Sequence, residues 1–298
     1  MSAKDTVFIQ TNAQQMLGAK VAAYSLKRNS KSPDSFDVRI MHVDDFPFLA
    51  ANEGRKFLRG LEHRVWRMDD LQSFTPLRFM PPQLMGYQGR AVVIDPDVFA
   101  VGDIRGLFDM DMHGTAIMCR IRPGYKDLPA YRASSVMLLD CAKLKHWRVE
   151  EQLEEVFDFK RDYLRWIKLD YEPEESVGLF GPEWNDFDRL TPETRLLHTT
   201  YRRTQPWKTG LPADFSIRRK PRGLKARKWI AYARQMLFGP TAEGVYLPHP
   251  DPNQERFFFV LLKECLQKGI VTEAEIRDEM RKNHVRHDAL EMVQKIAA

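Results

Sequence analysis

The chain has 298 residues, of which 43% are hydrophobic and 29% are charged, a composition that is typical of globular proteins and excludes disordered or fibrous ones. Lysine and arginine exceed aspartate and glutamate by 46 to 41, so the formal net charge is +5 and anionic partners are favoured. Three scattered cysteines exclude a disulfide framework and a zinc knuckle, and no apolar run approaches the roughly 20 residues of a membrane-spanning helix.

The first residues of the chain do not have the pattern of a secretory signal. Residues 1–12 (MSAKDTVFIQTN) lack an apolar core and a small-residue cleavage site. We therefore expect a cytoplasmic protein, in which Cys119, Cys141 and Cys265 are reduced and mostly buried.

The N-terminal part of the chain predicts alternating strands and helices. Residues 6–10 (TVFIQ) and 36–43 (FDVRIMHV) have the composition of strands, and the apolar spacing of residues 17–26 predicts a helix between them. Residues 64–68 (RVWRM) are a third candidate strand. Residues 90–94 (RAVVI) are apolar after the arginine, as expected of a strand that is buried on both faces, and they end abruptly in Asp-Pro-Asp.

The middle of the chain continues this pattern. Further strands are predicted at residues 115–121, 135–139 and 195–198, and a helix at residues 143–157. The succession predicts one α/β domain over residues 1–214. Because open α/β sheets bind their ligands at the carboxyl ends of the strands, we expect the chemistry near the Asp-Pro-Asp turn.

The last part of the chain, residues 215–298, is predicted to form a basic segment and a small helical module. Residues 215–242 contain no acidic residue and many arginines and lysines. Residues 254–268 predict a helix that is stopped by glycine at position 269, and Thr272 with Glu275 forms a capping box for the next helix.

Asp95 and Asp97 are candidate metal ligands. Pro96 stiffens the turn between them, so that both carboxylates can reach one cation. Oxygen ligands together with substrate phosphates suit Mg²⁺ or Mn²⁺. The alternative is an ordinary solvent-exposed turn, in which such pairs are common.

The residues around this pair favour the metal site. Residues 94–104 (IDPDVFAVGDI) resemble, over eleven consecutive positions, the signature of glycosyltransferase family 8, the group of glycogenin and the lipopolysaccharide galactosyltransferases. The resemblance implies a single mixed-sheet, nucleotide-sugar-binding α/β domain of the glycosyltransferase A type. It further implies transfer of a hexose from a nucleotide sugar, expected to be a UDP-sugar, with retention of configuration. The acceptor is not identified by the resemblance, and a carbohydrate or lipid-linked acceptor is expected.

The resemblance extends to other nucleotide-binding positions. Thr11 and Asn12 match the loop after the family's first strand, which contacts the nucleotide, and residues 75–79 (TPLRF) match the segment whose arginine, here Arg78, lies near it. A fixed guanidinium suits a diphosphate. The alternative for Arg78 is a surface salt bridge.

A late segment, residues 196–207 (LLHTTYRRTQPW), is similar to the family's H-x-x-G-x-x-K-P-W motif. The resemblance implies that His198 is the third protein ligand of the metal; the alternative is a structural histidine. Gln205 stands where the phosphate-binding lysine is expected, so Lys208, Arg202 or Arg203 would supply the missing positive charge.

The family's Asp-Gln pair near the anomeric carbon has no match in this chain. Glu174, Glu175 or Asp170 are the candidates for that catalytic position, and the alternative is a solvated acidic loop.

Two alternative functions remain open at this stage. A phosphatase of the haloacid dehalogenase class also uses Asp-x-Asp, although there the motif normally ends the first strand. Alternatively, the basic segment at residues 218–238 binds the inner face of a membrane peripherally, through an amphipathic helix at residues 225–238. The same helix could instead pack on the catalytic domain. Nucleic acid is not an expected partner, because no aromatic and basic platform accompanies the charge.

Overall fold

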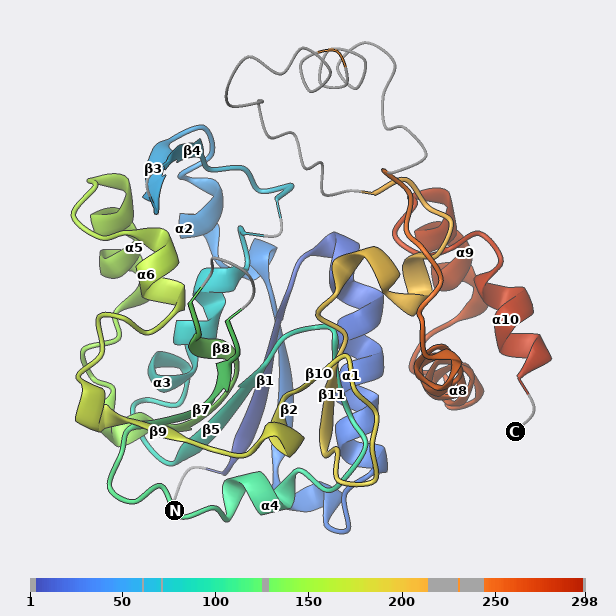
Figure 1. The fold of residues 1–298 in the computed structure, drawn as a ribbon, viewed down its shortest axis with the longest axis horizontal. Helices are drawn as coiled ribbons and strands as arrows, with labels where there is room; N and C mark the ends of the chain where they lie inside the picture. Colours follow the sequence, from blue (N-terminus) through green and yellow to red (C-terminus); the bar gives the residue numbers. More distant parts are fainter. Residues whose placement is uncertain are drawn as a thin grey trace. The chain divides into compact units, whose positions relative to one another are not determined.

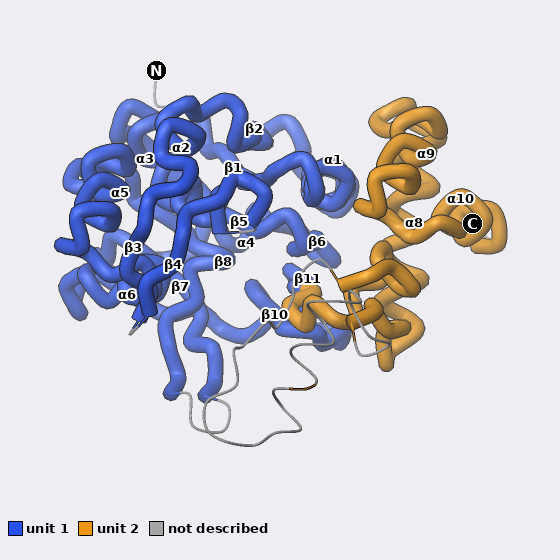
Figure 2. The backbone as a smooth tube through the Cα atoms, turned by 90° about the horizontal axis from the view of Figure 1, so that it is seen from above, with its two compact units in different colours: residues 1–198 blue, residues 199–298 orange. Residues whose placement is uncertain are grey.

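The computed structural model describes residues 4–60, 62–70, 72–124, 129–213, 230 and 244–296 of the chain (Figure 1). The chain divides into two compact units, residues 1–198 and 199–298, coloured separately in Figure 2. The boundary between these units lies before the one expected after residue 214. The two units are described separately.

The first unit is built on a mixed β-sheet, as the sequence predicts. Its six strands lie in the order β2-β1-β5-β8-β7-β9. They are β1 (Thr6–Thr11), β2 (Asp37–His42), β5 (Arg90–Ile94), β7 (Ile117–Arg122), β8 (Tyr131–Asp140) and β9 (Val177–Leu179). β1 is parallel to β2 and β5, β8 is antiparallel to β5 and β7, and β9 is parallel to β7. The expected α/β class is confirmed.

Two small sheets complete this unit. β6 (Val98–Ala100) follows the Asp-Pro-Asp turn and pairs antiparallel with β11 (Leu196–His198), which in turn pairs with β10 (Asp186–Phe187). β3 (Lys56–Arg59) and β4 (Glu62–Val65) form a hairpin of their own. The sheet of β10, β11 and β6 therefore brings the end of β11 next to the turn that follows β5.

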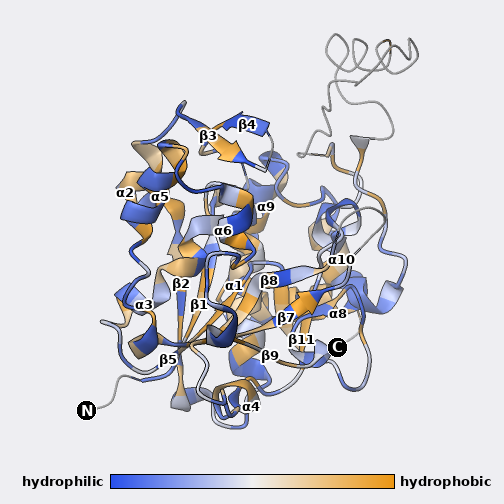
Figure 3. Ribbon diagram, turned by 60° about the vertical axis from the view of Figure 1, so that its left-hand side comes forward, coloured by the Kyte–Doolittle hydropathy of each residue, from blue (hydrophilic) through white to orange (hydrophobic). Residues whose placement is uncertain are grey.

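The helices of the first unit are mostly short. They are α1 (Met16–Arg28), α2 (Pro47–Ala50), α3 (Pro81–Leu84), α4 (Arg105–Phe108), α5 (Val149–Phe157) and α6 (Tyr163–Ile167). α1 contacts β1, β2 and β6, and α3 contacts β5. Much of the central sheet is coloured hydrophobic in Figure 3, whereas β4 is largely hydrophilic and all four of its residues are exposed.

Several predicted boundaries differ from the structure. The helix expected at residues 143–157 begins only at Val149, because the Asp140 side chain accepts a hydrogen bond from the Ala142 backbone and ends β8 in a tight turn. The strand expected at residues 64–68 is β4, which ends at Val65. Buried Trp66 follows it, and its indole N–H donates to the Leu49 carbonyl.

The second unit carries the expected C-terminal helices: α8 (Pro252–Gln267), α9 (Glu273–Arg281) and α10 (Ala289–Lys295). Gly269 has a φ of 68°, and Thr272 and Glu275 form the predicted capping box. The basic stretch at residues 215–242, with the candidate membrane-contact segment at 218–238, lies outside the described residues except for Ile230. Over the part of the chain that the structure describes, no helix combines the length and apolarity needed to cross a bilayer.

Candidate metal centre

Asp95 and Asp97 lie directly beyond the buried end of β5. The four residues before Asp95, Ala91 to Ile94, are fully buried, so the strand is rigid up to the turn. Helix α1 passes close beneath this turn. A Cβ atom placed on Gly18 of α1 would lie 2.7 Å from the Pro96 carbonyl oxygen, which is too close for any side chain. Glycine at position 18 therefore allows the helix to support the turn directly.

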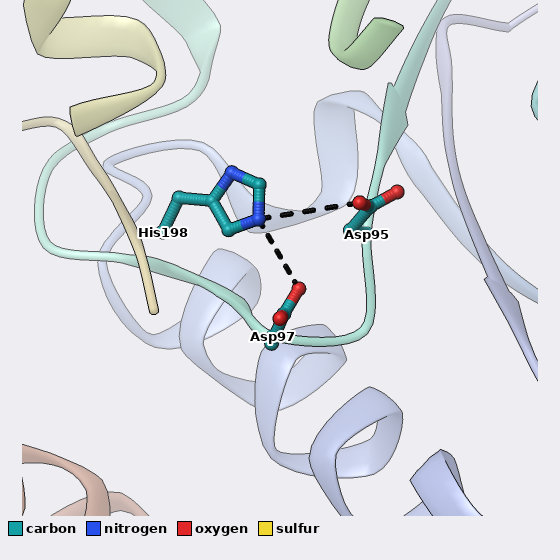
Figure 4. A group of neighbouring side chains, drawn as sticks. All are labelled: Asp95, Asp97 and His198. Atoms are coloured by element: carbon teal, nitrogen blue, oxygen red, sulfur yellow. Dashed lines mark ion pairs between the residues drawn. The ribbon is translucent and has the colours of Figure 1, made fainter. Parts of the chain in front are cut away.

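His198 reaches the same place from the other end of the unit's sequence. It is the last residue of β11 and pairs with Val98, the residue after Asp97. Its imidazole Nε2 lies 3.3 Å from Asp97 Oδ1 and 4.0 Å from Asp95 Oδ2 (Figure 4). One ligand atom from each of the three residues lies within 4.8 Å of the others. The structure thus brings together the three residues that the sequence suggests as metal ligands.

Asp95 is buried, and two polar side chains hold its carboxylate. Arg78, in the short helix η4 (Thr75–Phe79), donates from Nε to Oδ1 at 2.9 Å and from Nη2 to Oδ2 at 2.5 Å. Gln10, near the end of β1, donates to Oδ1 from its side-chain amide. Burial raises the pKa of Asp95, whereas the charge of Arg78 opposes that shift. Arg78 is therefore the main group that favours the ionised carboxylate.

A buried asparagine completes the surroundings of His198. Asn185 Oδ1 lies 2.8 Å from His198 Nδ1, and Asn185 Nδ2 donates to Ser135 Oγ at 3.1 Å. Ser135 belongs to β8, and its backbone carbonyl accepts a hydrogen bond from the Asp95 N–H at 3.0 Å. The neighbouring Ser134 accepts from Arg78 Nη1 at 3.0 Å. Hydrogen bonds thus connect all the elements that carry the candidate ligands.

The donor atoms of this cluster suit a divalent cation. Two carboxylates and one imidazole are ligands that Mn²⁺ and Mg²⁺ sites combine with water or substrate oxygens. The cluster lies at the carboxyl edge of β1 and β5, where ligands bind in open α/β sheets. Its donor set leaves coordination positions open, since three protein groups fill only part of an octahedral shell.

Thr11 and Asn12 lie at the same edge of the sheet. Ile9 of β1 pairs with Ile94 of β5, so the residues that follow both strands are neighbours in the fold. Thr11 and Asn12 are both buried. The side-chain oxygen of Asn12 has no hydrogen-bond partner within the described chain. A buried polar atom without a partner at this edge is compatible with the predicted nucleotide loop.

The structure does not bring Glu174 and Glu175 to the cluster. They lie in the exposed helix η6 (Glu174–Ser176), which leads into the start of β9. The first residue of β9 pairs with Ile117, which is level with Ala91 at the beginning of β5. Both glutamates therefore lie at the amino edge of the sheet, opposite to Asp95, and we do not assign them a catalytic role. Asp170 is exposed as well.

The remaining predicted positive charges belong to the second unit. Lys208 is 1% exposed, and its ammonium group lies 5.4 Å from the centre of the Tyr246 ring. Gln205, at the position of the family's lysine, is also buried. Arg202 and Arg203 lie in the short helix η8 (Arg202–Thr204) of the same unit.

Two residues of the site were not identified from the sequence. The sequence indicates only that Gln10 is a residue of the first strand. The alternation of side chains between the two faces of β1 is the only indication of where the Gln10 side chain points. Asn185 follows a tryptophan in a segment without a strong secondary-structure pattern. Its partner His198 is thirteen residues away in sequence, and nothing in the local spacing indicates that contact.

Comparison with known proteins gives matches in structure only. No family model matches the sequence, and no curated protein matches it either. Similar solved structures include three glycosyltransferases. GlyE of Streptococcus pneumoniae TIGR4 has a TM-score of 0.49 at 14% identity, covering 92% of this chain and 66% of that one. The galactosyltransferase LgtC, in complex with donor and acceptor sugar analogues, has a TM-score of 0.46 at 14% identity, covering 80% and 98%.

The third is the bifunctional glycosyltransferase WbbM, with a TM-score of 0.47 at 13% identity. The match covers 70% of this chain and 48% of WbbM, so the chain spans about half of that protein's length. Similarity at these values does not establish a function, which depends on the residues of the site itself.

Proposed function

We propose that the chain is a metal-dependent glycosyltransferase, similar to family 8, that transfers a hexose from a nucleotide sugar to a carbohydrate or lipid-linked acceptor. The observation that carries the proposal is the convergence of Asp95, Asp97 and His198 at the carboxyl edge of the sheet. The eleven-residue resemblance around Asp95 supports the same function independently of the geometry.

The proposed cation is Mn²⁺ or Mg²⁺, and the proposed donor is a UDP-sugar. A cation bound here supplies Lewis-acid stabilisation of the negative charge that develops on the leaving diphosphate. Asp95, Asp97 and His198 fix its position. Because all three side chains are at most 17% exposed, their geometry is set before the donor binds.

Arg78 has two roles in this proposal. Its guanidinium orients Asp95 through two hydrogen bonds and adds a positive charge beside the cluster. Thr11 and Asn12 are proposed to contact the nucleotide from the end of β1. Transfer with retention of configuration is proposed from the resemblance alone.

The phosphatase alternative conflicts with the place of the motif in the fold. In that class the Asp-x-Asp motif normally ends the first strand. Here it follows β5, well after β1 and β2 in the chain.

A donor screen tests the proposed function. Release of the nucleoside diphosphate from a panel of nucleotide sugars is measured with Mn²⁺ and with EDTA, for the wild type, Asp97→Ala and Asp111→Ala. Asp111 is a matched control, since its side chain is 77% exposed and lies outside the cluster. We expect Mn²⁺-dependent release for at least one UDP-sugar, lost in Asp97→Ala and kept in Asp111→Ala. Release that is equal in both variants would refute the assignment.

A further inference from the structure

The orientation of His198 is fixed by one hydrogen bond on the side of the ring away from the aspartates. A neutral imidazole carries its proton on one nitrogen and a lone pair on the other. His198 Nε2 faces Asp97 at 3.3 Å, so it is the nitrogen available to a cation. Nδ1 must then carry the proton, and a buried N–H needs an acceptor.

Asn185 Oδ1 is that acceptor, at 2.8 Å from His198 Nδ1. Asn185 is completely buried, and His198 is 4% exposed, so water does not compete for this contact. The ring of Phe187, whose centroid lies 5.7 Å from that of His198, offers no comparable acceptor. The proton on Nδ1 therefore depends on Asn185.

The amide of Asn185 is itself held in one orientation. Its Nδ2 donates to Ser135 Oγ at 3.1 Å, so the oxygen rather than the nitrogen faces His198. The backbone carbonyl of Asn185 accepts a hydrogen bond from Arg120 Nη1 at 2.5 Å. Side chain and backbone are thus anchored separately, which limits both rotation and displacement of the amide.

These contacts form a continuous path between two of the candidate ligands. The Asp95 N–H donates to the Ser135 carbonyl at 3.0 Å, the Ser135 hydroxyl accepts from Asn185, and Asn185 accepts from His198. The separation between the carboxylate on β5 and the imidazole on β11 is therefore set through β8 and the residue before β10. A change at Asn185 would alter the donor geometry without removing any ligand.

We propose that Asn185 is a positioning residue of the metal centre, which holds His198 as the Nδ1–H tautomer and leaves the Nε2 lone pair to a divalent cation. This inference rests on the proposed function, because it concerns the same metal centre. Removal of a hydrogen-bond partner behind a metal-binding histidine typically costs about 10- to 100-fold in metal affinity. Removal of Asn185 should have an effect of that size.

The test measures Mn²⁺ affinity by calorimetry for the wild type, Asn185→Leu and Asn185→Asp. We expect Asn185→Leu to bind Mn²⁺ about 10- to 100-fold more weakly. Asn185→Asp keeps an oxygen opposite Nδ1 and should restore binding to the wild-type level. Asn52→Leu is a matched control, because Asn52 is 4% exposed and its side chain is hydrogen-bonded to the Phe48 carbonyl and to Arg55, away from the cluster. Its replacement should not change the Mn²⁺ affinity.

The tautomer of His198 is a second readout that needs neither metal nor activity. Two-bond ¹H–¹⁵N correlation spectra of the metal-free wild type should show a proton on His198 Nδ1, whether or not Nε2 carries one as well. A ring with its proton on Nε2 alone would overturn the proposal, even if Asn185→Leu failed to fold.

The outcomes separate this inference from the proposed function. If the wild type binds Mn²⁺ and Asn185→Leu binds it equally well, Asn185 does not position the ligand, whereas the metal centre stands. If the folded wild type does not bind Mn²⁺ at all, the metal centre itself is wrong, and the inference fails with it.

Discussion

Arg78 holds both carboxylate oxygens of Asp95, with Nε 2.9 Å from Oδ1 and Nη2 2.5 Å from Oδ2. Both side chains are largely buried, at 14% and 12% exposed. Because burial raises the pKa of Asp95 and Arg78 opposes the rise, this pair keeps an anion available where a cation is proposed to bind. The Arg78–Asp95 ion pair therefore contributes both to the stability of the fold and to the proposed metal centre.

Replacing Arg78 should destabilise the protein strongly. Arg78→Gln leaves Asp95 buried without its positive partner, and breaking a buried ion pair in this way costs about 3–5 kcal/mol. Urea unfolding in EDTA measures the loss. Arg67→Gln is the matched control, because Arg67 makes the same two-point contact with Asp69 on the surface, where both side chains are at least 60% exposed. It should cost far less, because water solvates both exposed partners and screens their attraction. Equal losses would contradict this account.

Gly18→Ala should disturb the Asp-Pro-Asp turn. Alanine ordinarily stabilises a helix by about 1 kcal/mol relative to glycine. Here the added Cβ would lie 2.7 Å from the Pro96 carbonyl oxygen, and overpacking of this kind costs about 1–3 kcal/mol. We expect lower thermal stability together with weaker Mn²⁺ binding, as measured by melting with and without the ion. A variant that is more stable than the wild type would show that α1 does not support the turn.

Asp97→Asn should separate cation binding from folding. For the wild type, Mn²⁺ at a hundredfold excess over its dissociation constant should add about 2.7 kcal/mol of stability. In the variant this gain should disappear, while stability in EDTA is not reduced, because the negative charge of Asp97 raises the pKa of Asp95 and makes its ionisation harder. The control Asp111→Asn should keep the full gain. Equal stabilisation of Asp97→Asn by Mn²⁺ would be inconsistent with a ligand role.

The three cysteines should report on unfolding. Burial raises the pKa of each of Cys119, Cys141 and Cys265 from the usual 9.0 to about 12. The native protein at pH 8 should therefore resist thiol reagents that label all three cysteines in urea. Above pH 9 the unfolded thiols ionise while the native ones stay protonated, so stability should fall between pH 9 and about 12. Rapid labelling of the native protein would contradict their burial.

The fold class could be predicted from the sequence because its strongest signals are local. The continuous apolar run before Asp95 predicts a buried strand, and β5 is indeed the buried neighbour of β1. The capping box at Thr272 and Glu275 is equally local and is present in the structure. The small strands β6, β9 and β10 were not predicted, since two or three residues carry too little periodicity.

The candidate site was predictable only where its residues carry a pattern. Asp95 and Asp97 lie two residues apart in one motif, and His198 is identified through its resemblance to a family motif rather than through spacing. Asn185 and Gln10 act through contacts that depend on the pairing of strands far apart in sequence, which local patterns do not encode. The sequence also suggests Glu174 and Glu175 as residues near the donor, which the structure does not support. The sequence does not show that β9 enters the sheet from its amino edge, far from Asp95.

The central claim is that a cation held by Asp95, Asp97 and His198 binds the diphosphate of a nucleotide. Calorimetric titration of UDP into the protein, in Mn²⁺ and then in EDTA, tests it most directly. We predict saturable binding in Mn²⁺ that is abolished by EDTA and by Asp97→Asn. Binding of UDP that is unchanged by EDTA, or absent from the folded protein in the presence of Mn²⁺, would contradict the claim.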